Sequence, residues 1–211
     1  RISTARPLDR PRNGSPGRGA AIHYEVPQHC AAAIRAFQRQ AGATVHSVYL
    51  AAYFVWLWQI TKQRTANVIG PMNERSGDLR KLVGMFVNTL VYRTSVDPKE
   101  TFLEFCNQVK RVSAEAMEHS VPFDMLLSRM NAPRTNAALP FAQVMFNLAP
   151  TLNVRECAAL LKHGVNMCPR MWSLQGEFTP HVEIHLILFQ DADDGALQGF
   201  IHYNADLFDR I

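Results

Sequence analysis

One long apolar stretch limits most strongly what this chain can fold into. Residues 45–62 are apolar around nearly the whole circumference of a helix, and Thr44 is a suitable N-cap for it. Because such a helix must be covered on all sides, the sequence predicts a central, buried helix. Its most apolar part, residues 48–60, includes Tyr, Trp and Gln and is too short to span a membrane.

Strand patterns precede and follow this helix. Apolar residues that alternate or run together between turn residues predict strands at residues 21–26, 66–70, 86–94, 141–148, 182–190 and 197–204. Asp193, Asp194 and Gly195 predict a turn that joins the last two strands into a hairpin.

Further helices are predicted between these strands along the chain. The expected helices are residues 31–40, which Pro27 opens at its first turn and Gly42 stops, a long amphipathic helix from Asp97 or Pro98 to about Glu118, and residues 123–130. Strands and helices mixed in this way predict an α/β sandwich, in which helices flank a mixed sheet.

Composition narrows the possible classes of protein. The 211 residues are 47% hydrophobic and 19% charged, which is typical of a folded domain with a real core. Residues 1–19 are rich in Arg, Pro and Gly and are interpreted as a linker, so the folded unit is expected to be residues 20–211. The net charge of +4 is spread along the chain, so no nucleic-acid partner is expected. Few cysteines and no apolar signal region favour a cytoplasmic, soluble protein.

Patterns for metal binding or autonomous catalysis are incomplete. His181 and His185 have the spacing of a helical zinc site, but they fall in a strand pattern, where they would be roughly 13 Å apart at about 3.3 Å per residue. No Cys-x-x-Cys pair, Gly-x-Ser-x-Gly elbow or Gly-rich phosphate loop occurs. We therefore expect no metal site and no complete catalytic set in this chain.

Three stretches together resemble a known family. Residues 82–93 contain Gly-Met-Phe-Val-Asn-Thr-Leu followed by an Arg, and Gly-x-x-x-x-Arg precedes them at residues 70–75. Residues 121–124 are Val-Pro-Phe-Asp, and residues 140–147 are Pro-Phe-Ala-Gln-Val-Met-Phe-Asn. In this order, they resemble the condensation domains of nonribosomal peptide synthetases. The residues that match the motifs are Gly84, Phe86, Thr89, Arg93, Pro122, Phe123 and Gln143.

The resemblance extends over nearly the whole chain, with local departures. Residues 9–11 resemble the lead-in to the second lobe of such domains, and residues 202–209 resemble the closing strand. Residues 118–120 are Glu-His-Ser where the family usually has His-Gln-Asp, and Ala138 replaces a frequent Arg. These departures indicate an unusual subtype, with consequences for substrate or carrier recognition.

The resemblance implies a specific place in a larger enzyme. The family's catalytic motif, His-His-x-x-x-Asp-Gly, does not occur in this chain, so no residue here is expected to be catalytic. The chain would be the C-terminal lobe of a two-lobed domain with a chloramphenicol-acetyltransferase-like fold. Arg75 would pair with the Asp of the missing motif. Asn88 would orient a substrate amide or the phosphopantetheine arm.

The resemblance also implies partners. These are the N-terminal lobe, the upstream and downstream peptidyl carrier proteins and a neighbouring adenylation domain. Substrates would be carried on the 4′-phosphopantetheine of the carrier proteins, with no cofactor bound directly and no membrane contact. The implied function is amide-bond formation between a carrier-bound donor and a carrier-bound acceptor.

Other interpretations remain open. The chain fits an epimerisation domain, a stand-alone acyltransferase that uses coenzyme A, or a non-catalytic module that docks carrier proteins. Residue by residue, Arg75 fits an ordinary surface charge, Gly84 a tight turn and Asn88 a bond to a neighbouring loop, while Phe86 and Phe123 fit core positions. The lobe is expected to fold by itself, with Trp56 and Trp58 at least partly inside.

Overall fold

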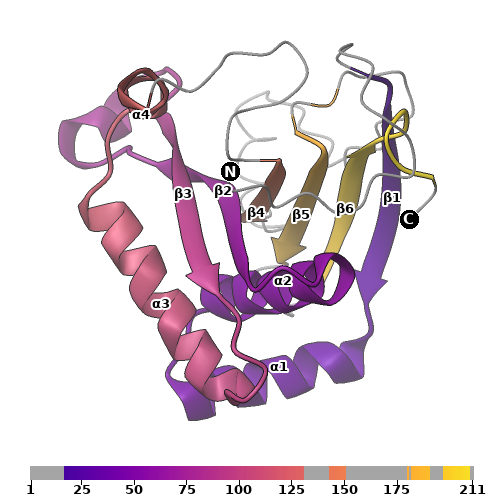
Figure 1. Cartoon of the computed structure of the whole chain (residues 1–211). Helices are drawn as coiled ribbons and strands as arrows, with labels where there is room; N and C mark the ends of the chain where they lie inside the picture. The colour runs from indigo at the N-terminus through magenta and orange to yellow at the C-terminus, as the bar shows by residue number, and fades with distance from the viewer. Residues whose placement is uncertain (1–16, 131–142, 151–179, 181, 191–196, 210–211) are drawn as a thin grey trace, which may run out of the picture.

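The computed structural model describes residues 17–130, 143–150, 180, 182–190 and 197–209. In this part of the chain, one six-stranded sheet is accompanied by helices, as Figure 1 shows. The elements in chain order are β1 (Gly19–Val26), α1 (Gln28–Ala41), α2 (Val45–Thr61), β2 (Thr65–Asn73), the 3₁₀ helix η1 (Gly77–Lys81), β3 (Val87–Ser95), α3 (Phe102–Glu118), α4 (Phe123–Arg129), β4 (Val144–Pro150), β5 (Ile184–Gln190) and β6 (Leu197–Asn204).

The sheet is mixed, as the sequence predicted. Its strand order is β1-β6-β5-β4-β2-β3. β4 runs parallel to both β2 and β5, whereas the pairs β1–β6, β5–β6 and β2–β3 are antiparallel. β5 and β6 are therefore the antiparallel neighbours that the hairpin pattern predicts, while the turn between them lies outside the described residues.

Helix α2 crosses the sheet and supplies the centre of the core (Figure 1). The predicted helix at residues 45–62 is confirmed to within one residue. Thr44 caps its start: the Thr44 hydroxyl accepts from the backbone N–H of Ser47, and the Ser47 hydroxyl accepts from that of Thr44. Lys62 ends the helix in the left-handed conformation, with φ of 59°.

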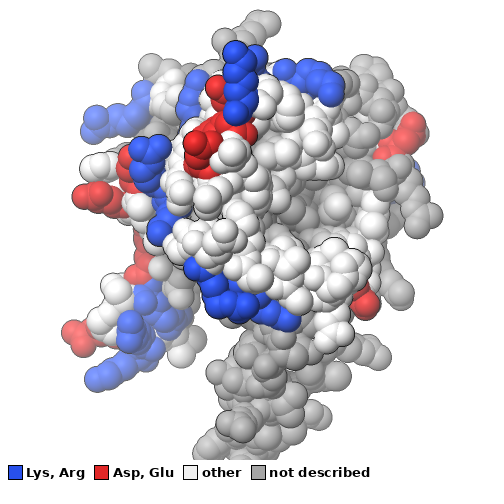
Figure 2. Space-filling model, turned by 90° about the horizontal axis from the view of Figure 1, so that it is seen from below, with Lys and Arg blue, Asp and Glu red and all other residues white. Residues whose placement is uncertain are grey.

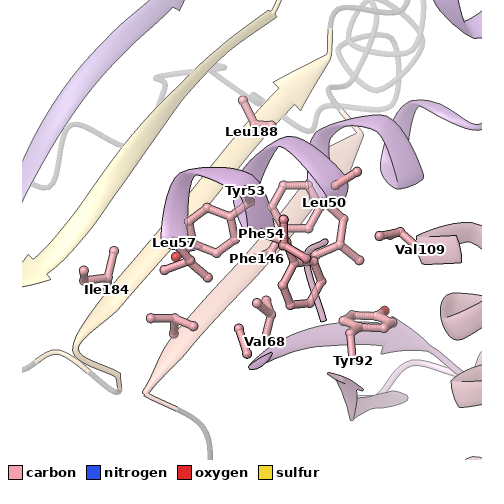
Figure 3. Packing of buried hydrophobic residues seen from close by; sticks show 14 of the residues in the cluster. Leu50, Tyr53, Phe54, Leu57, Val68, Tyr92, Val109, Phe146, Ile184 and Leu188 are labelled. Carbon is pink, nitrogen blue, oxygen red and sulfur yellow. The ribbon is translucent and has the colours of Figure 1, made fainter. Parts of the chain in front are cut away.

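The main core lies between α2, α3 and the sheet. Figure 3 shows Phe54 of α2 and Phe146 of β4 at its centre, and both are fully buried. Val68, Tyr92 and Val109 from β2, β3 and α3 extend the same cluster. Trp56 and Trp58 are partly buried against this cluster, which confirms that expectation.

The start of the long amphipathic helix differs from the prediction. α3 begins at Phe102 rather than at Asp97 or Pro98. Thr101 is its N-cap and forms a reciprocal capping box with Glu104, which fixes the first turn at this point. Asp97 instead accepts a hydrogen bond from the backbone of Lys99, which holds the preceding segment in a turn.

Other boundaries differ by smaller amounts. β1 begins at Gly19, inside the segment interpreted as a linker, and the carbonyl of Arg18 already accepts from the backbone of Ala205. Pro27 is the N-cap of α1 rather than a residue of its first turn. β2 continues to Asn73, whereas β5 begins at Ile184 and not at residue 182. Residues 141 and 142 of the predicted fourth strand lie outside the described residues.

The surface carries both signs of charge. On the face shown in Figure 2, Lys and Arg side chains lie at several separate places, with acidic side chains among them. Among the described residues, no helix is long and apolar enough to cross a membrane.

Candidate functional site

The loop between β2 and β3 carries the Arg that the motif comparison singled out. Its neck is closed by a hydrogen bond from the backbone N–H of Glu74 to the carbonyl of Phe86, at 2.9 Å. Arg75 follows directly, and its own backbone N–H donates to the side-chain oxygen of Asn73 at 2.9 Å. We call residues 74–86 the β2–β3 loop; η1 lies within it.

The guanidinium of Arg75 is bound inside this loop. Nη1 donates to the carbonyls of Leu79, at 3.4 Å, and Leu82, and Nη2 donates to the carbonyl of Gly84 at 2.8 Å. The guanidinium carbon also lies 4.8 Å from the centre of the Phe86 ring, close enough for a cation–π interaction. Arg75 is thus a half-buried structural residue and not the ordinary surface charge of the alternative interpretation.

Gly84 leaves space for a neighbouring ring and does not adopt the positive φ that favours glycine. It is absent from the glycines with positive φ, which are Gly17, Gly42 and Gly77. A Cβ atom at Gly84 would lie 3.1 Å from Cε2 of Phe86, tighter than ordinary van der Waals contact. Phe86 itself is half-buried beside the Arg75 guanidinium, outside the main core cluster. Gly84, Phe86 and Arg75 therefore form one packed unit.

Asn88, the second predicted site residue, links β3 to α4. Its Nδ2 donates to the carbonyl of Val121 at 3.0 Å, and its Oδ1 accepts from the backbone N–H groups of Thr89 and Phe123 at 2.8 and 3.2 Å. The side chain lies on the buried face of β3 and is 8% exposed. These contacts fit the bond to a neighbouring loop, and they leave little of the amide to orient a substrate.

The remaining motif residues divide into two groups. Pro122 is the N-cap of α4, and Phe123 packs against a small second cluster that contains Ile69 and Val182. The carbonyl of Gln143 accepts from the backbone of Glu183 and Ile184, which helps to align β4 and β5. By contrast, Thr89 and Arg93 alternate with the buried residues of β3, and the Arg93 side chain is exposed.

A polar depression lies beside Asn88. Its volume is about 370 Å³, and Glu74, Asn88, Thr89 and Asp124 are among the residues that line it. The lining also includes Val87, Pro122 and Phe123. The depression therefore joins the end of the β2–β3 loop to the start of α4, and it places two carboxylates near the segment that carries the most specific motif.

Exposed apolar side chains surround this region, and motif reasoning did not predict them. Val83 is fully exposed, Met85 is 88% exposed, and Leu82 and Val87 are about half exposed. Val121, Met125 and Met130 add exposed apolar surface beside and within α4. The signal in the sequence was weak, because Leu82, Val83 and Met85 follow neither a helical nor a strand period.

Nucleophile and metal chemistry have little support in the described part of the chain. Cys106 is fully buried, and burial raises the pKa of its thiol to about 11, so the thiolate is scarce near neutral pH. Among the described residues, no group of three His, Cys, Asp or Glu side chains is placed to bind a metal. His185 lies on β5 opposite His202 of β6, with ring centres 6.0 Å apart, while His181 is outside the described residues.

A second depression, of about 260 Å³, lies between α2 and the β1, β5 and β6 strands. Its lining is apolar and aromatic and includes Tyr49, Tyr53 and Trp56. Burial raises the pKa of Tyr49 to about 12, so its phenol stays protonated near neutral pH. This depression offers no evident acid–base group, and the region around Arg75 and Asn88 remains the candidate site.

Comparison with known proteins identifies the family. The family model described as "Condensation domain" matches residues 7–211. The chain is 31% identical over 208 residues to a linear gramicidin synthase of Brevibacillus parabrevis, covering 97% of this chain and 4% of that protein. It is 29% identical over 209 residues to the phosphinothricin tripeptide synthetase PhsB of Streptomyces viridochromogenes, covering 97% of this chain and 17% of that protein. The chain belongs to the condensation-domain family.

Solved structures show the same fold. The X-domain from teicoplanin biosynthesis superposes with a TM-score of 0.81 and 22% identity, covering 100% of this chain and 47% of that chain. A four-domain nonribosomal peptide synthetase bound to AMP and glycine gives a TM-score of 0.80 and 22% identity, covering 97% of this chain and 16% of that one. The mixed sheet with flanking helices is thus the fold of condensation-domain structures. The chain spans less than a fifth of the length of the two curated relatives.

Proposed function

We propose that this chain is the C-terminal lobe of a two-lobed condensation domain that joins a carrier-bound aminoacyl or acyl donor to a carrier-bound aminoacyl acceptor through an amide bond. The observation that carries the proposal is the match of the condensation-domain family over residues 7–211. The solved X-domain supports a second lobe, because the part of it that matches this chain is only 47% of its length. Both substrates would be carried on 4′-phosphopantetheine of carrier proteins, beside an adenylation domain.

The chemistry would reside mainly in the other lobe. The His-His-x-x-x-Asp-Gly motif of the family does not occur in these 211 residues, so the general base for the acceptor amine would come from the N-terminal lobe. This chain would supply one wall of the reaction site and the surface that meets the other lobe. The exposed apolar residues of the β2–β3 loop and α4 support that role, because an apolar area of this kind typically marks an interface.

Arg75 would contribute a charge to the closed domain. A carboxylate that is buried at a lobe interface is costly unless a guanidinium meets it. Arg75 lies at the end of β2, next to the exposed apolar loop residues, and its described hydrogen bonds go to carbonyl groups only. It is therefore suited to pair with the Asp of the motif in the N-terminal lobe. Such a pair would be architectural and would take no part in proton transfer.

Asn88 would act on the reaction through α4. Because its amide holds Val121 and Phe123, it fixes the start of α4 against β3 and shapes the depression that contains Glu74 and Asp124. We therefore assign to Asn88 the positioning of this wall, in place of direct contact with a substrate amide.

The test is an amide-formation assay with the complete protein that contains this chain. Donor and acceptor would be offered on separate holo carrier proteins, and the same donor would be offered as its coenzyme A thioester. We expect a carrier-bound dipeptide from the carrier substrates and little product from coenzyme A. Preference for the coenzyme A thioester would indicate a stand-alone acyltransferase. Inversion at the donor α-carbon without amide formation would indicate epimerisation, and carrier binding without any turnover would indicate a docking module.

A further inference from the structure

We propose that Arg75 is a positioning residue that gives the β2–β3 loop its shape before any partner binds, so that the loop presents Leu82, Val83 and Met85 as a preformed apolar contact. The occupant of that contact is the other half of the domain, and this identity rests on the proposed function. The loop-shaping role itself concerns this chain alone. The hydrogen bonds of one side chain and the exposure of three others carry the inference.

Three of the N–H donors of the Arg75 guanidinium are used inside the β2–β3 loop. A guanidinium has five N–H donors in a rigid plane. Nη1 and Nη2 hold the carbonyls of Leu79, Leu82 and Gly84, which occupies three of these donors. Within the part of the chain that the structure describes, Nε makes no hydrogen bond. Two N–H groups, one on Nη2 and one on Nε, thus remain for a further acceptor such as a carboxylate.

The apolar side chains of Leu82, Val83 and Met85, in the β2–β3 loop, pack little against the rest of the lobe. Val83 and Met85 are the two most exposed of the large apolar side chains described, and Leu82 is 52% exposed. Their backbone is nevertheless tied down, because Arg75 binds the carbonyls on both sides of Val83 and lies over the Phe86 ring at 4.8 Å. Without the guanidinium, the hydrogen bond between Glu74 and Phe86 and the turns at Leu79 and Leu82 would remain, but none of the described hydrogen bonds would hold the carbonyls of Leu82 and Gly84.

A preformed apolar loop suits association with a large, complementary surface. Burying exposed apolar side chains is favourable, and a loop that is already ordered loses less conformational entropy on binding. The two remaining donors of Arg75 add complementarity to a carboxylate on the same partner. The solved X-domain, whose fold matches all of this chain over 47% of its own length, leaves room for such a partner within one domain. The other half of the domain is therefore the partner that we expect to bind this loop.

Limited trypsin digestion tests the loop-shaping role on this chain by itself. Arg80 and Lys81 lie in η1, and both are exposed, so cleavage after either residue reports opening of the loop. We expect cleavage there to be roughly tenfold faster in Arg75→Gln, because local opening would become easier. Arg75→Lys should also be faster, since an ammonium group cannot span carbonyls that are held by a planar fork. Arg111→Gln, an exposed Arg on α3, is the matched control and should cleave at the rate of the unsubstituted chain.

Two results of this digestion would overturn the loop-shaping role. The first is cleavage after Arg80 or Lys81 at the unsubstituted rate in Arg75→Gln. The second is an equal acceleration after Lys110, in the middle of α3, because it would mean that the whole lobe opens and that Arg75 has no local function.

The contact itself is tested with Val83→Asp, prepared both in this chain and in the complete protein. Because Val83 touches little in the lobe, the melting temperature of this chain should not change. The melting temperature of the complete protein should fall, because a carboxylate would be buried against the other half. Met117→Asp, at an apolar side chain of α3 that is 54% exposed, is the control and should change neither melting temperature. If Val83→Asp left the melting temperature of the complete protein unchanged, Val83 would not be in contact with the other half of the domain. If the complete protein formed no amide bond, the proposed function would be wrong. The digestion result would still decide whether Arg75 shapes the loop.

Discussion

The side-chain oxygen of Asn88 accepts a hydrogen bond from the backbone N–H of Phe123 at 3.2 Å, although 35 residues separate the two along the chain. Phe123 is the first residue of α4, and the amide nitrogen of Asn88 donates to Val121 just before it. Besides its bond to the backbone of Thr89, this buried amide therefore satisfies two backbone groups at the start of α4 and sets the position of α4 against β3. Without Asn88, both backbone groups would have to find other partners.

Asn88→Ala is expected to loosen the start of α4. Leaving buried backbone groups unpaired costs about 1–3 kcal/mol, so the free energy of unfolding should fall by that order. Amide hydrogen exchange at residues 121–124 should accelerate more than exchange in β3. Chemical denaturation measures the free energy of unfolding, and mass spectrometry measures the amide hydrogen exchange. Asn107→Ala, at an exposed position of α3, is the matched control and should leave both unchanged. An equal response of the two variants would contradict the link between Asn88 and α4.

The contact between α2 and β4 predicts a large loss of stability when it is removed. Phe146 is fully buried beside Phe54 and Tyr53 (Figure 3), so Phe146→Ala should lower the free energy of unfolding by about 3–5 kcal/mol. Phe102→Ala is the control, because Phe102 is 40% exposed at the start of α3 and should cost far less. Urea titration of both variants measures the difference. Similar midpoints would mean that the core is not centred on Phe146.

The capping box of α3 gives a third prediction. Thr101→Ala removes the hydroxyl that accepts from the backbone of Glu104, and loss of such a cap typically costs about 1 kcal/mol. The Thr101 backbone and hydroxyl both donate to the Glu104 carboxylate and lower its pKa. In Thr101→Ala, the Glu104 pKa should therefore move back up toward its ordinary value. An NMR titration of Glu104 that shows the same pKa in both proteins would contradict this geometry.

Acid should destabilise the lobe partly through His46. Burial lowers the pKa of this imidazole, which packs edge-on against the Tyr92 and Phe146 rings. The unfolded chain then binds more protons than the folded one once the pH falls below about 6.5, so stability is present above that pH and is lost below it. Burial also lowers the pKa of His202, which adds to the effect.

His46→Gln separates the contribution of this histidine from the rest. The melting temperature of the unsubstituted chain should fall between pH 7.5 and 5.5, and the fall should be smaller in His46→Gln. Comparing the two pH profiles, and not the absolute melting temperatures, removes any cost of the substitution itself. Parallel profiles would exclude His46 as a source of the acid sensitivity.

Helix caps and the spacing of apolar residues predicted those helices and strands whose ends depend on residues close by in the sequence. The helix α2 was predicted to within one residue because Thr44 caps it and its whole circumference is apolar. The strand predicted at residues 86–94 is confirmed to within one residue at each end, because its side chains alternate between a buried and a more exposed face. The start of α3 was misplaced because Asp97 or Pro98 was taken as the starting residue, although Thr101 and Glu104 already form a capping pair in the sequence.

Long-range relationships could not be predicted in this way. The parallel pairing of β4 with β5 depends on the packing of the whole sheet and leaves no periodic signal in either strand. The partners of Asn88 lie 33 and 35 residues away, so the sequence offered a bond to a neighbouring loop as one interpretation but could not identify the start of α4 as the partner. Similarly, the motif pattern singled out Arg75, but the carbonyls it binds depend on the path of the loop between β2 and β3.

The proposed function is tested most directly by an amide-formation assay that compares this 211-residue chain with a two-lobed protein that contains it. Both would be incubated with the same donor-loaded and acceptor-loaded carrier proteins, and the carrier-bound product would be measured by mass spectrometry. We expect dipeptide from the complete protein and none from the chain alone above a control without protein, because the catalytic histidines would lie in the other lobe. Dipeptide from the chain alone would contradict this, since the catalytic group would then lie within residues 1–211.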